Sequence, residues 1–321
     1  MSINRINRRS FIQKSSLAAA AISSGVLATR CTTNEVKMPM RTLGKTGEKI
    51  SILGYGCGSQ FMLMEDGDWE PHLEHAYNEG INYFDTASTY GEDAPVPSEE
   101  RLGKIIPSFR KNIFLLTKMH ERDPETAKKE FERSLKRLKT DHVDALLIHT
   151  IGPRDTLMDI EKGVYQVLRK FKEEKTARYI GFSSMDSAEV SKDLIENLEF
   201  DVTLLAMNAT SYGNFVDITL PSAREKNLGI ISMKIMRDIV NKGANPQELL
   251  EYNWSLPDVA VNVVAMTGME PLKQNIEIAR NYGNGVLSSV DSIELENRMA
   301  HLATPDVLSW ARPGYYDGMI C

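Results

Sequence analysis

Short apolar runs alternate along this chain with longer stretches in which apolar residues recur at helical spacing. Phe131, Leu135 and Leu138 share such a spacing, which predicts an amphipathic helix. The short runs between these stretches predict strands. There are eight of them, at Ser51–Cys57, Asn82–Asp85, Ile113–Lys118, Val143–His149, Arg178–Phe182, Val202–Met207, Gly229–Met233 and Val261–Ala265.

Strands that alternate with helices indicate an α/β fold with a parallel sheet. Runs such as Ile113–Leu116 are apolar without alternation, as expected of strands covered on both faces. Eight strand–helix units in about 290 residues suit a closed (β/α)8 TIM barrel better than an open sheet. No G-x-G-x-x-G motif opens a helix after the first strand, which disfavours a Rossmann domain. The turn residues Gly44–Gly47 predict a β-hairpin that covers the N-terminal end of the barrel.

The first 31 residues differ from the rest. Arg5, Arg8 and Arg9 form a basic start, and a small-residue, weakly apolar run over Leu17–Ala28 is too short to span a bilayer as a stable helix. The pair Arg8-Arg9, followed by Ser-Phe-Ile, resembles a bacterial twin-arginine export signal. We therefore expect a signal segment at residues 1–31, a linker at 32–38 and one barrel at 39–321.

A twin-arginine signal implies a periplasmic or otherwise exported protein that uses the twin-arginine export machinery as a partner. Such export carries folded proteins, which suits a cofactor enzyme. A lipid anchor on Cys31 is the weaker alternative, because Arg30 stands where lipoproteins carry a small residue. No segment after the signal predicts a membrane-spanning helix.

The composition is that of an ordinary globular protein, with 42% apolar and 26% charged residues. The net charge of −6 argues against a nucleic-acid-binding groove, which needs a concentrated basic face. The three cysteines, Cys31, Cys57 and Cys321, suggest neither a disulfide framework nor a metal site.

Three of the predicted strands end in an ionisable residue. Asp85, Lys118 and His149 close the second, third and fourth strands. Charged side chains are seldom buried without a partner, and the carboxyl ends of barrel strands converge on the active-site mouth. A structural ion pair with a hydrogen-bonded histidine is the alternative for each residue alone. Three such residues at the same end of adjacent strands favour a catalytic site.

Tyr90 lies five residues after Asp85, on the loop at the same mouth. A free tyrosine titrates near pH ~10 and is a poor proton donor at neutral pH. A lysine ammonium within hydrogen-bond reach stabilises the phenolate, so we expect Lys118 to lower the pKa of Tyr90. Asp85 would hold Lys118 in place and keep it charged. A neutral His149 would hydrogen-bond the substrate oxygen and aim it.

With these four residues in this spacing, the sequence resembles the aldo/keto reductase family over about residues 39 to 285. The resemblance is carried by segments at residues 41–47, 84–87, 90–91, 116–118, 134–138, 144–149 and 178–183. The family implies a (β/α)8 barrel, NAD(P)H as cofactor, Tyr90 as general acid, and Asp85, Lys118 and His149 as its partners. The implied reaction interconverts a small-molecule carbonyl and an alcohol.

The positions that would hold the cofactor match the family less well. Ser183 and Ser184 occupy the positions of the family's serine–asparagine pair, which binds the nicotinamide carboxamide. Asn208 replaces the family's glutamine. In Met233-Lys234, Met233 occupies the position of the aromatic residue that stacks on the nicotinamide ring. Core packing is the alternative for Met233. The resemblance also implies a phosphate-binding turn into the last barrel helix, with candidate contacts at Gly268, Met269, Lys273, Gln274 and Glu277. NADP(H) is favoured over NAD(H), although Gln274 replaces an arginine that often contacts the 2′-phosphate.

A cofactor-binding sensor or regulatory barrel without turnover is the rival interpretation. The four catalytic positions favour an enzyme, whereas the altered nicotinamide pocket leaves the rival open. Loops at the barrel mouth determine substrate specificity, and the sequence does not predict their conformation. These are the 92–97 insertion, the 151–157 loop and the tail from Trp310 to Cys321, which contains Tyr315 and Tyr316.

Overall fold

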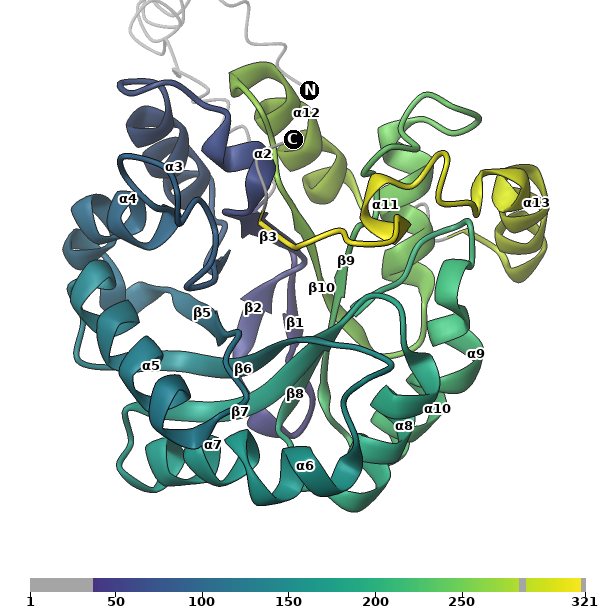
Figure 1. Cartoon of the computed structure of the whole chain (residues 1–321). Helices are drawn as coiled ribbons and strands as arrows, with labels where there is room; N and C mark the ends of the chain where they lie inside the picture. Colours follow the sequence, from purple (N-terminus) through teal and green to yellow (C-terminus); the bar gives the residue numbers. More distant parts are fainter. Residues whose placement is uncertain (1–36, 283–286, 319–321) are drawn as a thin grey trace, which may run out of the picture. The chain divides into compact units, whose positions relative to one another are not determined.

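The computed structural model describes residues 37–282 and 287–318, in which eight parallel strands close into a barrel surrounded by helices (Figure 1). The strands are β3 Leu53–Gly56, β4 Tyr83–Asp85, β5 Phe114–Met119, β6 Val143–Ile151, β7 Ala177–Ser184, β8 Val202–Ala206, β9 Gly229–Met233 and β10 Val259–Val264. They pair in chain order, and β10 closes the ring against β3. All eight predicted strands and the (β/α)8 fold class are confirmed. The predicted signal segment and Cys321 lie outside the described residues.

Helices follow the strands on the outside of the barrel. They are α2 Ser59–Met62, α3 Trp69–Asn78, α4 Ser98–Ile105, α5 Pro124–Leu138, α6 Leu157–Lys162, α7 Val164–Glu173, α8 Ala188–Asn197, α9 Phe215–Ile218, α10 Leu220–Glu225, α11 Pro246–Ser255, α12 Met269–Asn281 and α13 Ser289–Met299. Helix α5 shows how the local sequence determines where a helix begins. Asp123 accepts a hydrogen bond from the backbone N–H of Thr126 at its start, and Pro124 occupies the first turn. No helix in the described part of the chain is long and apolar enough to cross a membrane.

The predicted N-terminal hairpin is also present. Strands β1 Met40–Thr42 and β2 Lys49–Ser51 pair antiparallel around a turn that packs against the residues preceding β9. Gly44 has a positive φ, and a Cβ there would lie 2.3 Å from the carbonyl oxygen of Leu228, so the close approach requires glycine. Glu48 accepts a hydrogen bond from the hydroxyl of Tyr179 on β7 at 2.9 Å, which fastens the hairpin to the barrel.

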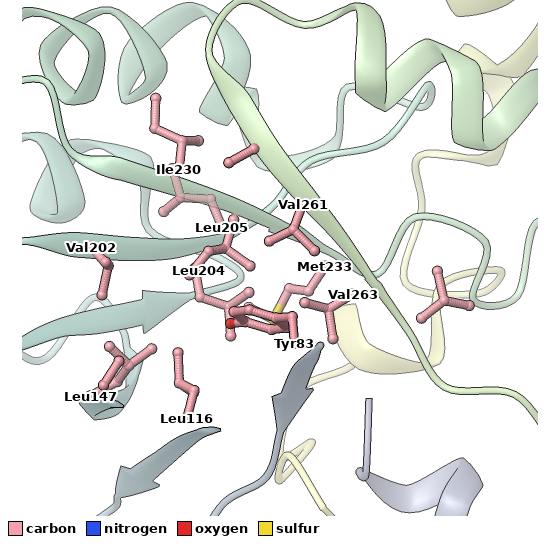
Figure 2. Packing of buried hydrophobic residues seen from close by; sticks show 14 of the residues in the cluster. Tyr83, Leu116, Leu147, Val202, Leu204, Leu205, Ile230, Met233, Val261 and Val263 are labelled. Carbon is pink, nitrogen blue, oxygen red and sulfur yellow. The ribbon is translucent and has the colours of Figure 1, made fainter. Parts of the chain in front are cut away.

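The barrel interior is filled by side chains rather than open. Figure 2 shows aliphatic side chains from several strands gathered around the ring of Tyr83. Gly54 makes room for this ring, because a Cβ there would lie 2.7 Å from Tyr83 Cδ1 and 2.9 Å from Val261 Cγ2. The packed interior leaves the carboxyl ends of the strands as the place where polar side chains converge.

Candidate active site

The four residues predicted to be catalytic come together at the carboxyl ends of neighbouring strands. Asp85 ends β4, Lys118 lies near the end of β5, and His149 lies near the end of β6. The register places Asp85 beside Leu116 and Lys118 beside Leu147, so all three side chains belong to the same end of the barrel. Tyr90 reaches the group from the loop after β4. All four side chains are buried.

The centre of the site is a buried ion pair. Lys118 Nζ donates to Asp85 Oδ1 at 2.6 Å and to the carbonyl oxygen of Thr86 at 2.8 Å. Burial raises the pKa of the Asp85 carboxyl, and the Lys118 ammonium opposes that rise. The second oxygen, Asp85 Oδ2, is buried and has no hydrogen-bond partner in the described residues, so it is an acceptor that a ligand hydroxyl can satisfy.

Tyr90 is held over this pair by its loop. The backbone N–H of Thr86 donates to Leu116 O at 2.9 Å, and that of Ser88 donates to Lys118 O at 3.1 Å, so the loop continues the barrel's pairing for several residues. Lys118 Nζ donates to Tyr90 Oη at 3.2 Å and lies 4.7 Å from the centre of its ring. The predicted contact between the ammonium and the phenol is therefore present.

His149 is neutral at physiological pH. Burial lowers the pKa of its imidazole to about 4, although the neighbouring Asp317 opposes the change. Its Nε2 lies 3.1 Å from Asp317 Oδ2, and its Nδ1 lies 3.4 Å from Thr89 Oγ1. Because a carboxylate only accepts, the neutral ring must carry its proton on Nε2, the nitrogen that faces the site.

Asp317 is a site residue that sequence reasoning missed. The C-terminal tail, drawn in yellow in Figure 1, runs back across the strand ends. The carboxylate of Asp317 is buried and contacts the site residues. Tyr90 Oη donates to Asp317 Oδ2 at 2.8 Å, so the tyrosine and His149 share one carboxylate oxygen. Lys234 Nζ donates to the other oxygen, Oδ1, at 2.7 Å, and Tyr315 Oη donates to it at 3.0 Å. A single acidic residue in a short tail carries no pattern that would have indicated this position.

Asp317 changes the electrostatics of the site. Burial alone would raise the pKa of its carboxyl, but Lys234 and His149 hold that pKa well below the usual range. Burial and the charges of Asp317 and Asp85 raise the pKa of Tyr90 well above its usual value. This direction is opposite to the sequence-based expectation, because burial of the phenol comes first, and Asp317, which accepts its hydrogen bond, adds to the effect.

The loops around the mouth are fixed by two further charged side chains. Arg122 donates to Asp155 Oδ1 at 2.9 Å and to His149 O at 2.9 Å, which joins the loops after β5 and β6. Glu130 of α5 accepts from the backbone N–H groups of His120 and Glu121, both at 3.0 Å. The mouth next to His149 is thus built from fixed loops, as precise positioning requires.

A cavity of about 440 Å³ opens beside Tyr90 and Asp317, within the range of roughly 300–1,000 Å³ that is usual for small-molecule sites. It follows the carboxyl ends of β9 and β10 toward the start of α12. Three predicted cofactor residues, Met233, Lys234 and Gln274, line this cavity. Within residues 37–282 and 287–318, no group of three His, Cys, Asp or Glu side chains could hold a metal ion.

The other predicted nicotinamide contacts have their polar groups engaged elsewhere. Ser183 Oγ accepts from the backbone N–H of Thr150 at 2.9 Å, and Ser184 Oγ donates to Ile151 O at 2.7 Å. The Asn208 amide donates to Lys234 O at 3.1 Å and accepts from Thr210. These three side chains join the strand-end loops to one another.

The remaining predicted positions belong to α12. Gly268 precedes the helix with φ near 100°, and Met269 begins it. Lys273 lies 3.7 Å from Glu270 and is 54% exposed. Gln274 and Glu277 are also exposed. The start of α12 therefore offers free helix N–H groups and one weakly paired cation, which suits a phosphate group.

Comparison with known proteins agrees with this fold. A family model described as "Aldo/keto reductase family" matches residues 54–245. L-galactose dehydrogenase of Arabidopsis thaliana is 29% identical over 61% of this chain and 65% of its own length. An uncharacterized oxidoreductase of Bacillus subtilis is 27% identical over 75% of this chain and 91% of its own length. This chain thus spans just under two thirds of the Arabidopsis relative.

Solved structures show the same architecture. A putative aldo-keto reductase from Pseudomonas aeruginosa matches with a TM-score of 0.64 at 26% identity, over 75% of this chain and 94% of its own. The holo form of an aldo-keto reductase from Bacillus halodurans matches with a TM-score of 0.67 over 81% of this chain and 96% of its own, and at 19% identity it supports the fold alone. The chain belongs to the aldo/keto reductase family, a family of NAD(P)H-dependent oxidoreductases.

The buried pair makes a prediction about stability. Lys118→Met leaves the Asp85 carboxylate buried without a partner, and breaking such a pair costs ~3–5 kcal/mol of unfolding free energy. Adding Asp85→Asn to Lys118→Met removes the uncompensated charge, so the double variant is more stable than Lys118→Met alone. Urea unfolding of the wild type, both single variants and the double variant measures the coupling.

The exposed pair between Arg224 and Asp258, 2.7 Å apart, is the matched control. Arg224→Met should change the unfolding free energy by ~1 kcal/mol or less, because surface pairs contribute little. A Lys118→Met variant that loses no more than this control would contradict the buried-pair interpretation.

Proposed function

We propose that this chain is an NAD(P)(H)-dependent oxidoreductase that interconverts a carbonyl and an alcohol, with Tyr90 as general acid and base. One observation supports this most directly. Tyr90 Oη and His149 Nε2 both reach a single oxygen, Asp317 Oδ2, at 2.8 and 3.1 Å. A substrate carbonyl oxygen at that position would meet both donors in the same way.

Each side chain has a distinct part in the proposed proton transfer. His149, neutral and protonated on Nε2, orients the carbonyl oxygen. Tyr90 gives its phenol proton to that oxygen as charge develops there, and the Lys118 ammonium stabilises the resulting phenolate. Asp85 pairs with the Lys118 ammonium and holds it in place. The cofactor, when bound, supplies the hydride for the carbonyl carbon.

The cavity residues fit a nicotinamide cofactor. Asp85 Oδ2, which is buried and unpartnered in the described residues, suits a ribose hydroxyl. Met233 lies in the cavity wall where its sulfur can pack on a ring. Arg237 also lines the cavity, and the start of α12 suits the diphosphate. We favour NADP(H) over NAD(H), with the exposed Lys273 as the candidate partner for the 2′-phosphate.

Substrate can bind only when Asp317 leaves, because its Oδ2 holds the position proposed for the reacting oxygen. The proposed catalytic cycle therefore includes displacement of the tail. The substrate class includes aldehydes, ketones and sugar-derived carbonyls. The name of the Arabidopsis relative, L-galactose dehydrogenase, supports the inclusion of sugars.

Substitution of Tyr90 tests the proposed function. Tyr90→Phe removes the transferred proton and leaves the cavity wall intact, so turnover should fall by about 10²–10⁴-fold. NADPH binding, followed by fluorescence quenching, should change little. The readout is NADPH oxidation with a panel of aldehydes, ketones and sugars.

Tyr77→Phe is the matched control, since this tyrosine lies on α3 and bonds Asn112 away from the site. It should keep wild-type turnover. Wild-type turnover by Tyr90→Phe would exclude Tyr90 as the proton donor. Tight NADPH binding by the wild type without oxidation by any carbonyl would favour a cofactor-binding sensor.

We also propose that the protein is exported in its folded state through the twin-arginine machinery, as the Arg8-Arg9 pair indicates. Replacement of both arginines by lysine keeps the charge and should retain the protein in the cytoplasm, as measured by cell fractionation. Arg5→Lys is the control and should leave the distribution unchanged. Equal periplasmic amounts for the double variant and the control would overturn the export proposal.

A further inference from the structure

The C-terminal tail is fitted to the catalytic site. Gly318 has φ near 104°, and a Cβ there would lie 2.6 Å from Tyr90 Cδ1, so the chain passes close over the tyrosine ring. Asp317 then has both carboxylate oxygens bonded inside the site. The site therefore accommodates a carboxylate and offers a hydrogen-bond donor to each of its oxygens.

The charges around Asp317 form two pairs. Lys118 is paired with Asp85 at 2.6 Å, and Lys234 is paired with Asp317 at 2.7 Å. When Asp317 leaves for substrate, Asp85 remains with Lys118 and Lys234 loses its counter-ion. With the tail in place the Lys234 side chain is only 9% exposed and its ammonium is paired, so departure of Asp317 removes its counter-ion. An anionic group in the same place restores the balance.

The anion must lie close to the reacting oxygen. Lys234 Nζ bonds Oδ1 of the same carboxylate whose Oδ2 is bonded by Tyr90 and His149. A cofactor diphosphate does not fit this position, because a ribose separates it from the nicotinamide ring at which the carbonyl reacts. A substrate carboxylate on the carbon next to the carbonyl does fit, since its oxygen lies beside the carbonyl oxygen.

We propose that Lys234 selects a substrate that carries a carboxylate next to the reacting carbonyl, and that Asp317 takes the place of that carboxylate in the free enzyme. The proposal rests on the proposed function and narrows its substrate to a 2-oxo acid or the corresponding 2-hydroxy acid. In the reduction, hydride from NAD(P)H adds to the keto carbon, Tyr90 gives its proton to the keto oxygen, and NAD(P)+ is released. The substrate carboxylate keeps its charge and stays bonded to Lys234.

A binding experiment without cofactor tests the carboxylate position. Asp317→Ala removes the internal carboxylate, and calorimetry measures binding of oxamate, a carboxylate next to an amide carbonyl that is not reduced. Oxamate should bind Asp317→Ala. It should bind Asp317→Ala/Lys234→Met at least about tenfold more weakly, because a charge-assisted hydrogen bond is lost. Asp317→Ala/Lys234→Arg should restore binding. Equal binding with and without the Lys234 cation would overturn the proposal.

Turnover tests the selectivity of the complete enzyme. Pyruvate and phenylpyruvate should be reduced with kcat/KM about tenfold or more above that of their methyl esters. Lys234→Met should lower the ratio of kcat/KM for the acids to kcat/KM for the esters by about tenfold, whereas the exposed Lys242→Met control should leave this ratio unchanged. Asp317→Ala should raise kcat/KM for the acids because its internal competitor is gone.

The outcomes separate the two proposals. Reduction of esters and aldehydes without preference for the acids would overturn the assignment of Lys234 and leave the proposed function standing. Failure to reduce any carbonyl, together with oxamate binding that depends on Lys234, would overturn the proposed function and leave the carboxylate site standing.

Discussion

The buried ion pair between Lys118 and Asp85 is the interaction on which the rest of the site depends. Lys118 Nζ lies at the end of an apolar strand and contacts Asp85, the carbonyl of Thr86 and the phenol of Tyr90. An unpartnered ammonium could not remain in this packed interior. The pair therefore fixes two strands and the loop that carries Tyr90 relative to one another, and it places a charge next to the tyrosine.

The tail adds a second ion pair, between Asp317 and Lys234. Its carboxylate opposes the effect of Lys118 on the Tyr90 phenol. Lys118 favours the phenolate, whereas Asp317 favours the protonated phenol by accepting its hydrogen bond. The free enzyme therefore keeps Tyr90 protonated and unable to act as a base. Because the carboxylate also holds the place proposed for the substrate oxygen, the proposed entry of substrate would remove the internal ligand and restore the influence of Lys118 in one step.

Much of the fold was predictable because its physical signals are local. Apolar runs without alternation, such as Ile113–Leu116, predict strands buried on both faces, and ionisable residues at their ends predict a convergent site. The turn at Gly44–Gly47 predicted the hairpin in the same way. These signals were sufficient for the barrel and for the juxtaposition of Asp85, Tyr90, Lys118 and His149.

The contribution of the tail could not be predicted from sequence. Asp317 stands in a short segment without periodicity, and its partners are far away along the chain. Lys234 was expected on the cofactor side, but its ammonium bonds this tail carboxylate. The hydroxyls of Ser183 and Ser184 are engaged by neighbouring backbone, which only three-dimensional packing determines.

The most direct test of this account is the pKa of the Tyr90 phenol, measured by alkaline absorbance titration. The difference between a protein and its Tyr90→Phe counterpart isolates this tyrosine from the others. We expect a lower pKa of Tyr90 in Asp317→Asn than in the wild type, because the carboxylate that accepts its hydrogen bond is removed while Lys118 remains. An unchanged or higher pKa in Asp317→Asn would contradict it.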